Sequence, residues 1–556
     1  MSSFFNHFSR FEKLILMVIF AIFCHNLFLD IMIVDAAQYA GMSAEMAKTN
    51  SFLQVKECGG DYLDKPPLLF WLSSCSIKLF GVSNFAYKLP SFLILLLSIY
   101  AVFRFSLLYY SVQVAKNAAL ILASCQAYFL ITNDVRTDAI LTGMVVTASW
   151  LVSAYFQNRK LKYLLFGAFF IGLGMLAKGP IALIAVLFPL GINLMYQNKW
   201  KDVFNWRWIF VIFVIAIALL PMCYGLYIQF DAQPNKVTYG KVGQSGLYFY
   251  FWLQSFGRIT GENSWNNGLP WHYFLGSSLW DFFPWILPLY FAVFFQIKKI
   301  FSDKKKVVEI TSLVGFMSLF VMMSLSKYKL QHYIFVSFPY AAVLGALYFS
   351  EIKTFVWHRW KTVFMVLSVL ILVLFLVYQI IFFTDFKLWL FVCFIMQIFG
   401  LCYFYQQKVN SVFQLLGLVL TLNVFLSFVF YPKLLTFQAD SMAGKWAFDN
   451  IKNQEIVTFE NASNSFNFYT KNPFTKIVTN EILENQKSDF WVIMDNQQYQ
   501  KFQSIISKKY IVAETKVFDD FAVTRLSLPF LLQSTRKQQL EKKYLIKIHP
   551  IQPKSS

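Results

Sequence analysis

Charged side chains in this sequence gather in short stretches beside long apolar runs. The stretch "GGDYLDKPPLLFWLSSCSIKLFG", residues 59–81, places Asp64 and Lys65 directly before two prolines and a run of Leu, Phe and Trp. Proline is tolerated in the first turn of a helix and keeps the residue before it extended. Lys65 is therefore predicted to stand on rigid, non-helical backbone ahead of a helix, where its ammonium group could neutralise a phosphate. The alternative is a lysine that reaches from the membrane edge into water.

Carboxylates occupy similar positions at the ends of other apolar runs. Asp35 follows the run "IMIV", where it could accept a proton from an acceptor hydroxyl or position the attacking group. The alternative for Asp35 is a solvated residue at a helix end. The stretch "NDVRTDAILTGM" places Asp134, Arg136 and Asp138 in one short turn. These three charges either contribute to a site or neutralise one another at the surface.

Further basic and aromatic candidates also lie within a few residues of an apolar run. They are Lys178 in "MLAKGPIAL", Arg258 in "QSFGRIT", and Lys327, Lys329 and Tyr333 in "SLSKYKLQHYIFVSFP". The neighbouring His332, like His272, is more often a satisfied structural residue than a ligand. The sequence contains no GxSxG elbow, phosphate-binding glycine loop or HExxH motif, and none of its cysteines form a CxxC pair. No metal ligand set or cofactor is therefore assigned, and a divalent metal stays open.

Composition indicates that these residues are positioned by membrane-spanning helices. Of the 556 residues, 57% are hydrophobic and 14% are charged, whereas about 25% of residues are charged in ordinary soluble domains. Several apolar runs reach about 20 residues, enough to cross a hydrocarbon core of roughly 30 Å. We predict a polytopic α-helical membrane protein. The net charge of +20 resides mainly in short loops and not in a basic groove with stacking aromatics, which argues against a nucleic-acid partner.

About thirteen spans are predicted from the apolar runs. They cover residues 11–33, 89–110, 115–132, 138–157, 161–177, 179–197, 207–229, 274–296, 307–325, 330–350, 358–382, 386–405 and 411–431. Residues 66–80 are apolar but too short to cross at about 1.5 Å per residue, so a buried or interfacial helix is expected there, with a further span as the alternative.

Loop charges orient these spans. With the N-terminus inside, basic residues concentrate in the inner loops, as the positive-inside rule requires. The inner basic groups are Arg159–Lys160, Lys199–Lys201, Lys298–Lys299, Lys304–Lys306 and His358–Arg359. Two long outer loops follow from this orientation, residues 34–88 and 230–273, within a transmembrane module of residues 1–433. The mixed, polar residues 434–530 are predicted to form a small external α/β domain, and residues 531–556 a basic, loosely ordered tail.

The candidate residues all fall on the outer side of this topology. A ring of span ends around one outer cavity would bring them together. Basic residues there run against the positive-inside trend, so they indicate an anionic ligand such as a lipid phosphate.

Several segments resemble a known family of membrane enzymes. The segments "DAAQYAGMSAEM" and "DYLDKPPLLFWLSSCSIKLFGVSNFAYKLPS" resemble the first outer loop of the aminoarabinose transferases, GT-C membrane glycosyltransferases of the protein mannosyltransferase-like group. "RTDAILTGM", "GLGMLAKGPIAL" and "SKYKLQHYIFVSFP" resemble later segments in the same order. The likeness covers roughly residues 10–350. The sequence departs from the family at Ala36, where glutamate is usual, and at Gln38, where aminoarabinose transferases carry an arginine.

The resemblance implies transfer of a sugar from a polyprenyl-phosphate donor to a lipid A-like lipid or other glycan, on the periplasmic side of the inner membrane. It implies that Asp35 is catalytic, that Lys65 binds the carrier phosphate with Asp64 beside it, and that Tyr333 and Arg258 belong to the site. We expect direct, inverting displacement with no nucleotide site. The expected site residues are Asp35 and Asp138 as catalytic groups, and Asp64, Lys65, Lys178, Arg258, Lys327, Lys329 and Tyr333 as substrate-binding groups.

Two alternatives remain open. The acceptor could be a serine or threonine of a protein, which would make the chain a protein O-glycosyl (mannosyl-type) transferase. A transporter or flippase for a lipid-linked sugar is the alternative of another class. Transporters usually show internal repeats and charges at mid-membrane, whereas here the charges gather at outer span ends and no repeat is visible.

Overall fold

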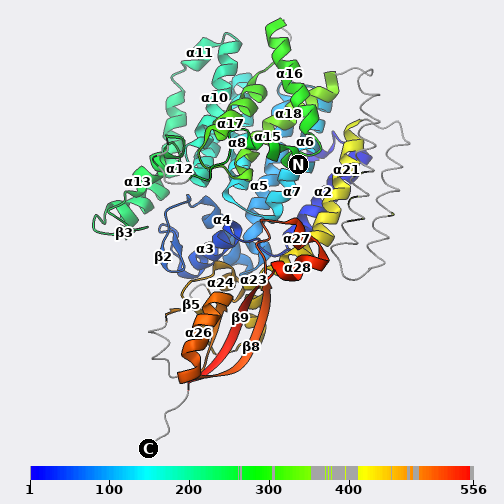
Figure 1. Cartoon of the computed structure of the whole chain (residues 1–556). Coiled ribbons are helices and arrows are strands. Elements are labelled where there is room, and N and C mark those ends of the chain that lie inside the picture. The colour runs from blue at the N-terminus through cyan, green and yellow to red at the C-terminus, as the bar shows by residue number, and fades with distance from the viewer. Residues whose placement is uncertain are drawn as a thin grey trace, which may run out of the picture.

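The computed structural model combines a long bundle of helices with a sheet domain at one end (Figure 1). It describes residues 2–260, 262, 266–302, 307–351, 370, 374, 377, 395, 411–452, 454–472, 476–479 and 488–550. The predicted spans 358–382 and 386–405 lie outside these residues, apart from the four single positions.

Apolar sequence determines which helices build the bundle. The long helices are α2 (Arg10–Asn26), α5 (Asn84–Leu107), α6 (Val112–Ser124), α7 (Gln126–Asn133), α8 (Thr137–Asn158), α9 (Leu161–Lys178), α10 (Ile181–Tyr196), α12 (Trp208–Leu226), α15 (Tyr273–Asp281), α16 (Ile286–Ser302), α17 (Thr311–Leu325), α18 (Phe338–Glu351) and α21 (Ser411–Phe425). Among the described residues, six helical segments are long and apolar enough to cross a membrane, and α6 with α7, bent by 47°, makes a seventh. The prediction of a multi-pass helical membrane protein is confirmed, whereas the total of thirteen spans stays a prediction.

Further helices, turns and two-residue strands lie before, between and after these helices. In the bundle they are α1 (Ser2–Phe5), α3 (Asp35–Thr49), β1 (Lys56–Glu57), β2 (Gly60–Asp61), α4 (Leu68–Phe80), α11 (Trp200–Val203), η1 (Tyr227–Asp231), β3 (Val237–Thr238), β4 (Lys241–Val242), α13 (Gly246–Tyr248), η2 (Phe249–Leu253), α14 (Gly257–Thr260), η4 (Gln331–Ser337), η5 (Leu426–Phe430), α22 (Tyr431–Leu434) and η6 (Leu435–Phe437). The helix α4 has 13 residues and begins directly after Pro67, which confirms the prediction of a helix too short to cross. It packs on α3, where the Ser74 hydroxyl donates to the main-chain oxygen of Ser43 at 2.8 Å.

Two predicted spans are wrong in their extent. The span 11–33 ends at Asn26, where the buried Lys88 ammonium donates to the main-chain oxygens of Asn26 at 3.0 Å and Leu29 at 2.9 Å. These carbonyls lack helical partners, so a buried cation there stabilises the helix end. The span 274–296 is broken into α15 and α16. Pro284 lies at the break, where a proline cannot donate the hydrogen bond that would continue a helix.

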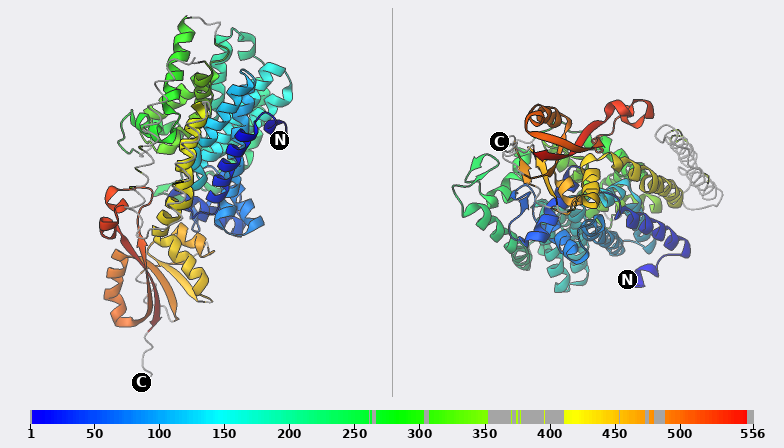
Figure 2. Two further views of the ribbon diagram at one scale, coloured as in Figure 1. Left: turned by 90° about the vertical axis from the view of Figure 1, so that its right-hand side faces the viewer. Right: turned by 90° about the horizontal axis from the view of Figure 1, so that it is seen from below.

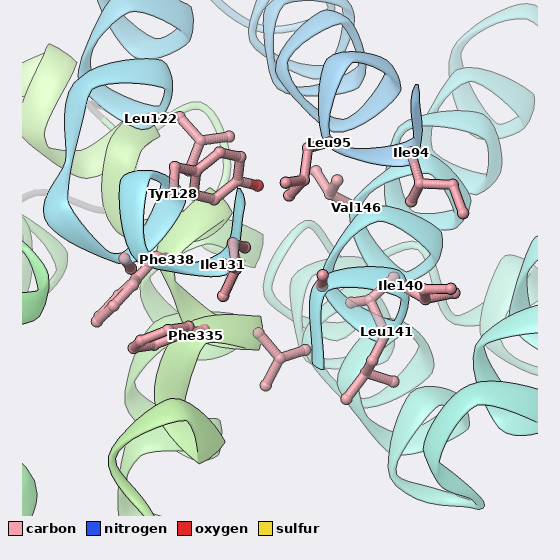
Figure 3. Packing of buried hydrophobic residues seen from close by; sticks show 14 of the residues in the cluster. Ile94, Leu95, Leu122, Tyr128, Ile131, Ile140, Leu141, Val146, Phe335 and Phe338 are labelled. Atoms are coloured by element: carbon pink, nitrogen blue, oxygen red, sulfur yellow. The ribbon is translucent and has the colours of Figure 1, made fainter. Parts of the chain in front are cut away.

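Close helix packing holds the centre of the bundle (Figure 3). Residues of α5, α7, α8 and η4 meet there, among them Leu95, Ile131 and Phe335. Gly143 allows α5 and α8 to approach, because a Cβ at this position would lie 2.3 Å from the Ile94 side chain. The bundle therefore forms a rigid frame for the loops at its outer end.

The sheet domain is an α/β unit, as predicted. Its elements are α23 (Ala439–Asn450), β5 (Glu455–Phe459), α24 (Asn464–Tyr469), β6 (Lys476–Val478), β7 (Phe490–Asp495), α26 (Asn496–Lys509), β8 (Tyr510–Asp520), α27 (Leu528–Leu531), α28 (Gln533–Gln539) and β9 (Glu541–Pro550). The strand order is β6-β5-β7-β9-β8, with β5 parallel to β6 and β7 and with β9 antiparallel to β7 and β8. The strand β9 lies in the segment 531–556, where a loosely ordered tail was expected, and it instead completes the sheet.

The sheet domain docks on the first outer loop (Figure 2). The main-chain nitrogen of Ile31 donates to the Tyr469 hydroxyl, and that of Ile33 to Gln438 Oε1, both at 2.8 Å. Lys445 pairs with Asp30 at 2.5 Å. These contacts place the sheet domain at the ends of the spans that the sequence predicts to be external.

Figure 1 places α11 at the end of the bundle remote from the sheet domain, and this separation gives a test of the topology. Alkaline phosphatase inserted after Asn198, beside α11, is expected to be inactive because that loop faces the cytoplasm by the positive-inside rule. The same reporter inserted after Leu526, in the sheet domain, is expected to be active. Equal activity at both positions would contradict the topology.

Candidate functional site

A pocket lies at the ends of α9, α10 and α17 that the sequence predicts to be external, and its space, open solvent included, is about 760 Å³. Lys65, Lys178 and Tyr333 line its polar part, and Gln254 and Ser255 lie beside them. Its apolar wall consists of Ile181, Ile184, Met322 and Met323. A basic head next to an apolar wall suits a ligand with an anionic group on a hydrocarbon chain.

Lys65 stands on non-helical backbone directly before Pro66 and α4, as predicted. Its ammonium group lies 2.5 Å from Asp64 Oδ2. Gln254, from the second long outer loop, donates to the main-chain oxygen of Asp64 and, at 2.8 Å, to Asp64 Oδ1. The carboxylate therefore orients Lys65, and Gln254 fixes the carboxylate.

Lys178, the last residue of α9, joins three elements. Its ammonium group pairs with the carboxylate of Asp138 in the first turn of α8. It also lies 3.9 Å from the centre of the Tyr333 ring in η4, within the range of a cation–π contact. His332 Nε2 lies 3.6 Å from the second oxygen of Asp138. Asp138 is 3% exposed, so the ion pair anchors the Lys178 ammonium group to the protein interior.

Asp35 belongs to a second cluster, at the start of α3. The Arg136 guanidinium donates to Asp35 Oδ2, and its Nε donates to Asp134 Oδ2 at 2.7 Å. Burial raises the pKa of Asp134, and Arg136 opposes this effect. Although burial lowers the pKa of Arg136, Asp134 and Asp35 raise it above its usual range. The guanidinium thus stays charged, while a third of the Asp35 side chain is exposed.

Tyr39 follows Asp35 by four residues in α3 and is buried. Its side chain is 3% exposed. Burial raises the pKa of its phenol well above the usual value, and the charges of Asp35, Asp64 and Asp138 raise it further. Arg136, which pairs with Asp35, and Asp138, which pairs with Lys178, are two residues apart in the chain, so the Asp35 cluster and the lysine-lined cavity are neighbours.

Not all predicted site residues converge. Lys65, Lys178 and Tyr333 line one cavity, with Asp64 and Asp138 as the partners of the lysines. Lys327 is exposed and does not line this cavity. Lys329 is buried, and its ammonium group donates to the main-chain oxygens of Ser326 at 2.5 Å and Leu269 at 3.1 Å. Lys329 therefore fixes a loop.

Arg258 lies in α14, but its side chain is outside the described residues. Neither Gln254 nor Tyr39 is a predicted site residue, because an amide or a phenol in a long loop is not distinctive. The Arg136–Asp35 pair joins residues far apart in the chain, which spacing cannot reveal. Among the described residues, no group of three or more His, Cys, Asp or Glu side chains is arranged to hold a metal ion.

The fold matches that of a known class of membrane proteins. The solved structure of ArnT from Cupriavidus metallidurans bound to undecaprenyl phosphate superposes with a TM-score of 0.74 at 13% identity, covering 96% of this chain and 97% of that one. Its apo structure superposes with a TM-score of 0.73. The chain therefore has the GT-C fold of that protein, with the membrane bundle and the sheet domain both included.

Sequence comparison agrees with the fold. Residues 64–224 match the family "Dolichyl-phosphate-mannose-protein mannosyltransferase". The undecaprenyl phosphate-α-4-amino-4-deoxy-L-arabinose arabinosyl transferase of Aeromonas salmonicida is 28% identical over 326 residues, covering 56% of this chain and 55% of that protein. Transferase 1 of the same name from Proteus mirabilis is 26% identical over 324 residues. The chain thus spans about half the length of these relatives in sequence, and the resemblance to the aminoarabinose transferases is confirmed.

The hydrogen bonds of Gln254 give a test of the geometry. Gln254→Ala removes both contacts to Asp64, so we expect faster amide exchange in residues 62–65 and a free energy of unfolding lower by about 1–3 kcal/mol. Hydrogen–deuterium exchange with mass spectrometry and denaturant titration in detergent measure these effects. Gln233→Ala is the matched control, because the Gln233 side chain bonds only to a nearby exposed main-chain oxygen. Identical exchange in both variants would contradict the role of Gln254.

Proposed function

We propose that this protein is a membrane glycosyltransferase that moves a sugar from a polyprenyl-phosphate carrier to a lipid A-like lipid or other glycan, on the periplasmic side of the inner membrane. The observation that carries the proposal is the cavity in which Lys65 and Lys178 lie beside an apolar wall at the outer span ends. The fold shared with a protein solved with undecaprenyl phosphate supports the same ligand class.

The two lysines would stabilise the leaving phosphate. Charge develops on the phosphate oxygen as the bond to the sugar breaks, and fixed cations aimed at this position lower the barrier. Asp64 and Asp138 hold Lys65 and Lys178 in place before the donor arrives. Ile184 and Met323, on the apolar wall, would contact the first units of the carrier.

Asp35 would act on the acceptor. The attacking oxygen forms a bond to the anomeric carbon while the bond from that carbon to the phosphate oxygen breaks, so the configuration inverts and polyprenyl phosphate leaves. If the acceptor is a hydroxyl, its proton passes to the Asp35 carboxylate. Arg136 orients this carboxylate, and the exposed third of the side chain gives the acceptor access.

Transfer to a protein is the second candidate. The match of residues 64–224 to the family whose description names protein mannosyltransferases favours it. Mass spectrometry of envelope lipids and glycoproteins from a deletion strain separates the two. A sugar lost from lipids or glycans supports the first candidate, and one lost from serine or threonine side chains supports the second.

Lys65 gives the sharpest test of the donor site. Lys65→Ala is expected to abolish transfer, because the leaving phosphate loses a direct cation. Lys65→Arg is expected to stay poor, since a planar guanidinium does not replace a compact ammonium. Transfer from a radiolabelled polyprenyl-phosphate sugar measures both. Lys241→Ala, an exposed lysine in the second outer loop, should leave transfer unchanged. Full activity of Lys65→Ala would refute the donor site.

Asp35 distinguishes the two kinds of acceptor chemistry. A general base typically contributes about 10²–10⁴-fold, so Asp35→Asn should lose activity on that order if the acceptor is a hydroxyl, while donor binding survives. An ionised phosphate acceptor offers no proton, so the loss would then be smaller and would not ease as pH rises. Rate–pH profiles of both proteins decide this, with Asp449→Asn on the exposed face of α23 as the control. Wild-type turnover by Asp35→Asn would show that another carboxylate serves.

A further inference from the structure

A second, open pocket lies between the sheet domain and the start of α3, and its space, open solvent included, is about 1120 Å³. We call it the acceptor crevice. Its walls come from the loop after β5, the end of β7, the neighbouring strand β9 and the outer loop of the bundle. The side chains used below are Gln38, Glu57, Asp440, Thr458, Asp495 and Lys543.

The crevice lies where the topology of the sheet opens a gap. The strands β5 and β7 are parallel neighbours. The chain leaves β5 toward α24, which packs with α23 on one face through Phe466, whereas it leaves β7 toward α26, which packs on the other face through Phe502. The two connections diverge at the carboxyl ends of the strands. Ligands in open α/β sheets bind at such switch points.

The acceptor crevice contains a buried hydroxyl group, that of Thr458, without a hydrogen-bond partner among the described residues. This residue of β5 lines the crevice and is 1% exposed. Buried polar groups nearly always have a partner, and leaving one unsatisfied costs about 1–3 kcal/mol. A ligand with hydroxyl groups would satisfy Thr458.

The charges of the crevice select against an anion. Glu57, Asp440 and Asp495 line it together with a single lysine, Lys543. Lys543 is already engaged, because its ammonium group lies 2.8 Å from Asp440 Oδ1 and 3.8 Å from Asp520 Oδ2. Carboxylates accept hydrogen bonds from sugar hydroxyls and repel a phosphate, whereas amides can both donate to and accept from such hydroxyls. The lining therefore fits a neutral carbohydrate.

The wall facing the bundle is preorganised and leads to Asp35. Gln38 donates to Glu57 Oε1 at 2.8 Å, and Asn464 of the sheet domain donates to the same oxygen at 2.7 Å. Val34, directly before Asp35, and Gln38, three residues after it, both line the crevice. The crevice thus extends to the end of α3 that carries Asp35.

We infer that the acceptor crevice binds the hydroxyl-bearing carbohydrate headgroup of the acceptor and presents it toward Asp35. This inference rests on the proposed function and assigns acceptor recognition to the carboxyl ends of β5 and β7. It places the donor in the bundle and the acceptor against the sheet domain, with α3 between them.

Binding of a neutral N-acetylglucosamine disaccharide to the full chain in detergent, measured by saturation-transfer NMR without donor, tests the inference. Thr458→Val and Asp495→Asn should each weaken binding by about 2–10-fold, the value of one hydrogen bond. Thr515→Val and Asp519→Asn are matched controls on the exposed side of β8 and should bind as the wild type does. Thr458→Val should unfold no more easily than the wild type, because it removes an unsatisfied hydroxyl.

Several outcomes would overturn the inference: no disaccharide binding, equal binding by all four variants, or displacement of the disaccharide by a serine-containing peptide or by inorganic phosphate. The result stays separate from the proposed function, because the assay requires neither donor nor turnover. A wild type that binds the disaccharide but transfers no sugar from polyprenyl phosphate would refute the proposed function alone. A wild type that transfers normally, with an acceptor KM unaffected by Thr458→Val and Asp495→Asn, would refute the crevice alone.

Discussion

The cost of burying charge beside apolar helices governs the outer end of this molecule. A charge removed from water is strongly destabilising unless an opposite charge and hydrogen bonds compensate it. Asp138 on α8 meets Lys178 on α9, and Arg136 meets Asp35 on α3. Each pair joins elements that follow different apolar runs, so pairing fixes the span ends relative to one another.

In the proposed function, the same pairing prepares the lysines for an anionic ligand. A lysine held by an aspartate loses little side-chain freedom when a phosphate arrives, because its rotamer is already selected. Lys178 is held further by the face of Tyr333. Lys329 illustrates the contrast, since main-chain oxygens occupy its ammonium group. Lys178 and Lys329 carry the same charge but have different roles, because a carboxylate holds the first and main-chain oxygens hold the second.

Hydropathy was sufficient to predict the membrane class, most span positions and the short helix α4, because these depend on composition along one segment. It was insufficient where a residue distant in the sequence determines the end of a span. The first span ends early because Lys88, about sixty residues later, binds its terminal carbonyls. The basic residues around β9 led to the prediction of a loosely ordered tail instead of a strand. The apolar residues Tyr544, Ile546 and Ile548 nevertheless alternate, as one buried face of a strand requires. Its Lys543 is paired within the domain, so high charge did not mean exposure.

The helix α3 is the physical link between the two halves of the candidate site. One side of it meets the bundle through α4, where Ser43 accepts from Ser74. The other meets the sheet domain at Gly41, where a Cβ would lie 2.7 Å from Asn464 Oδ1, so a side chain at this position would force Asn464 to shift. Because Asn464 also holds Glu57, the wall of the acceptor crevice and the position of Asp35 depend on one helix. If the proposed roles hold, a change in the sheet domain would alter which acceptor reaches Asp35 and would leave the donor site at Lys65 and Lys178 unchanged.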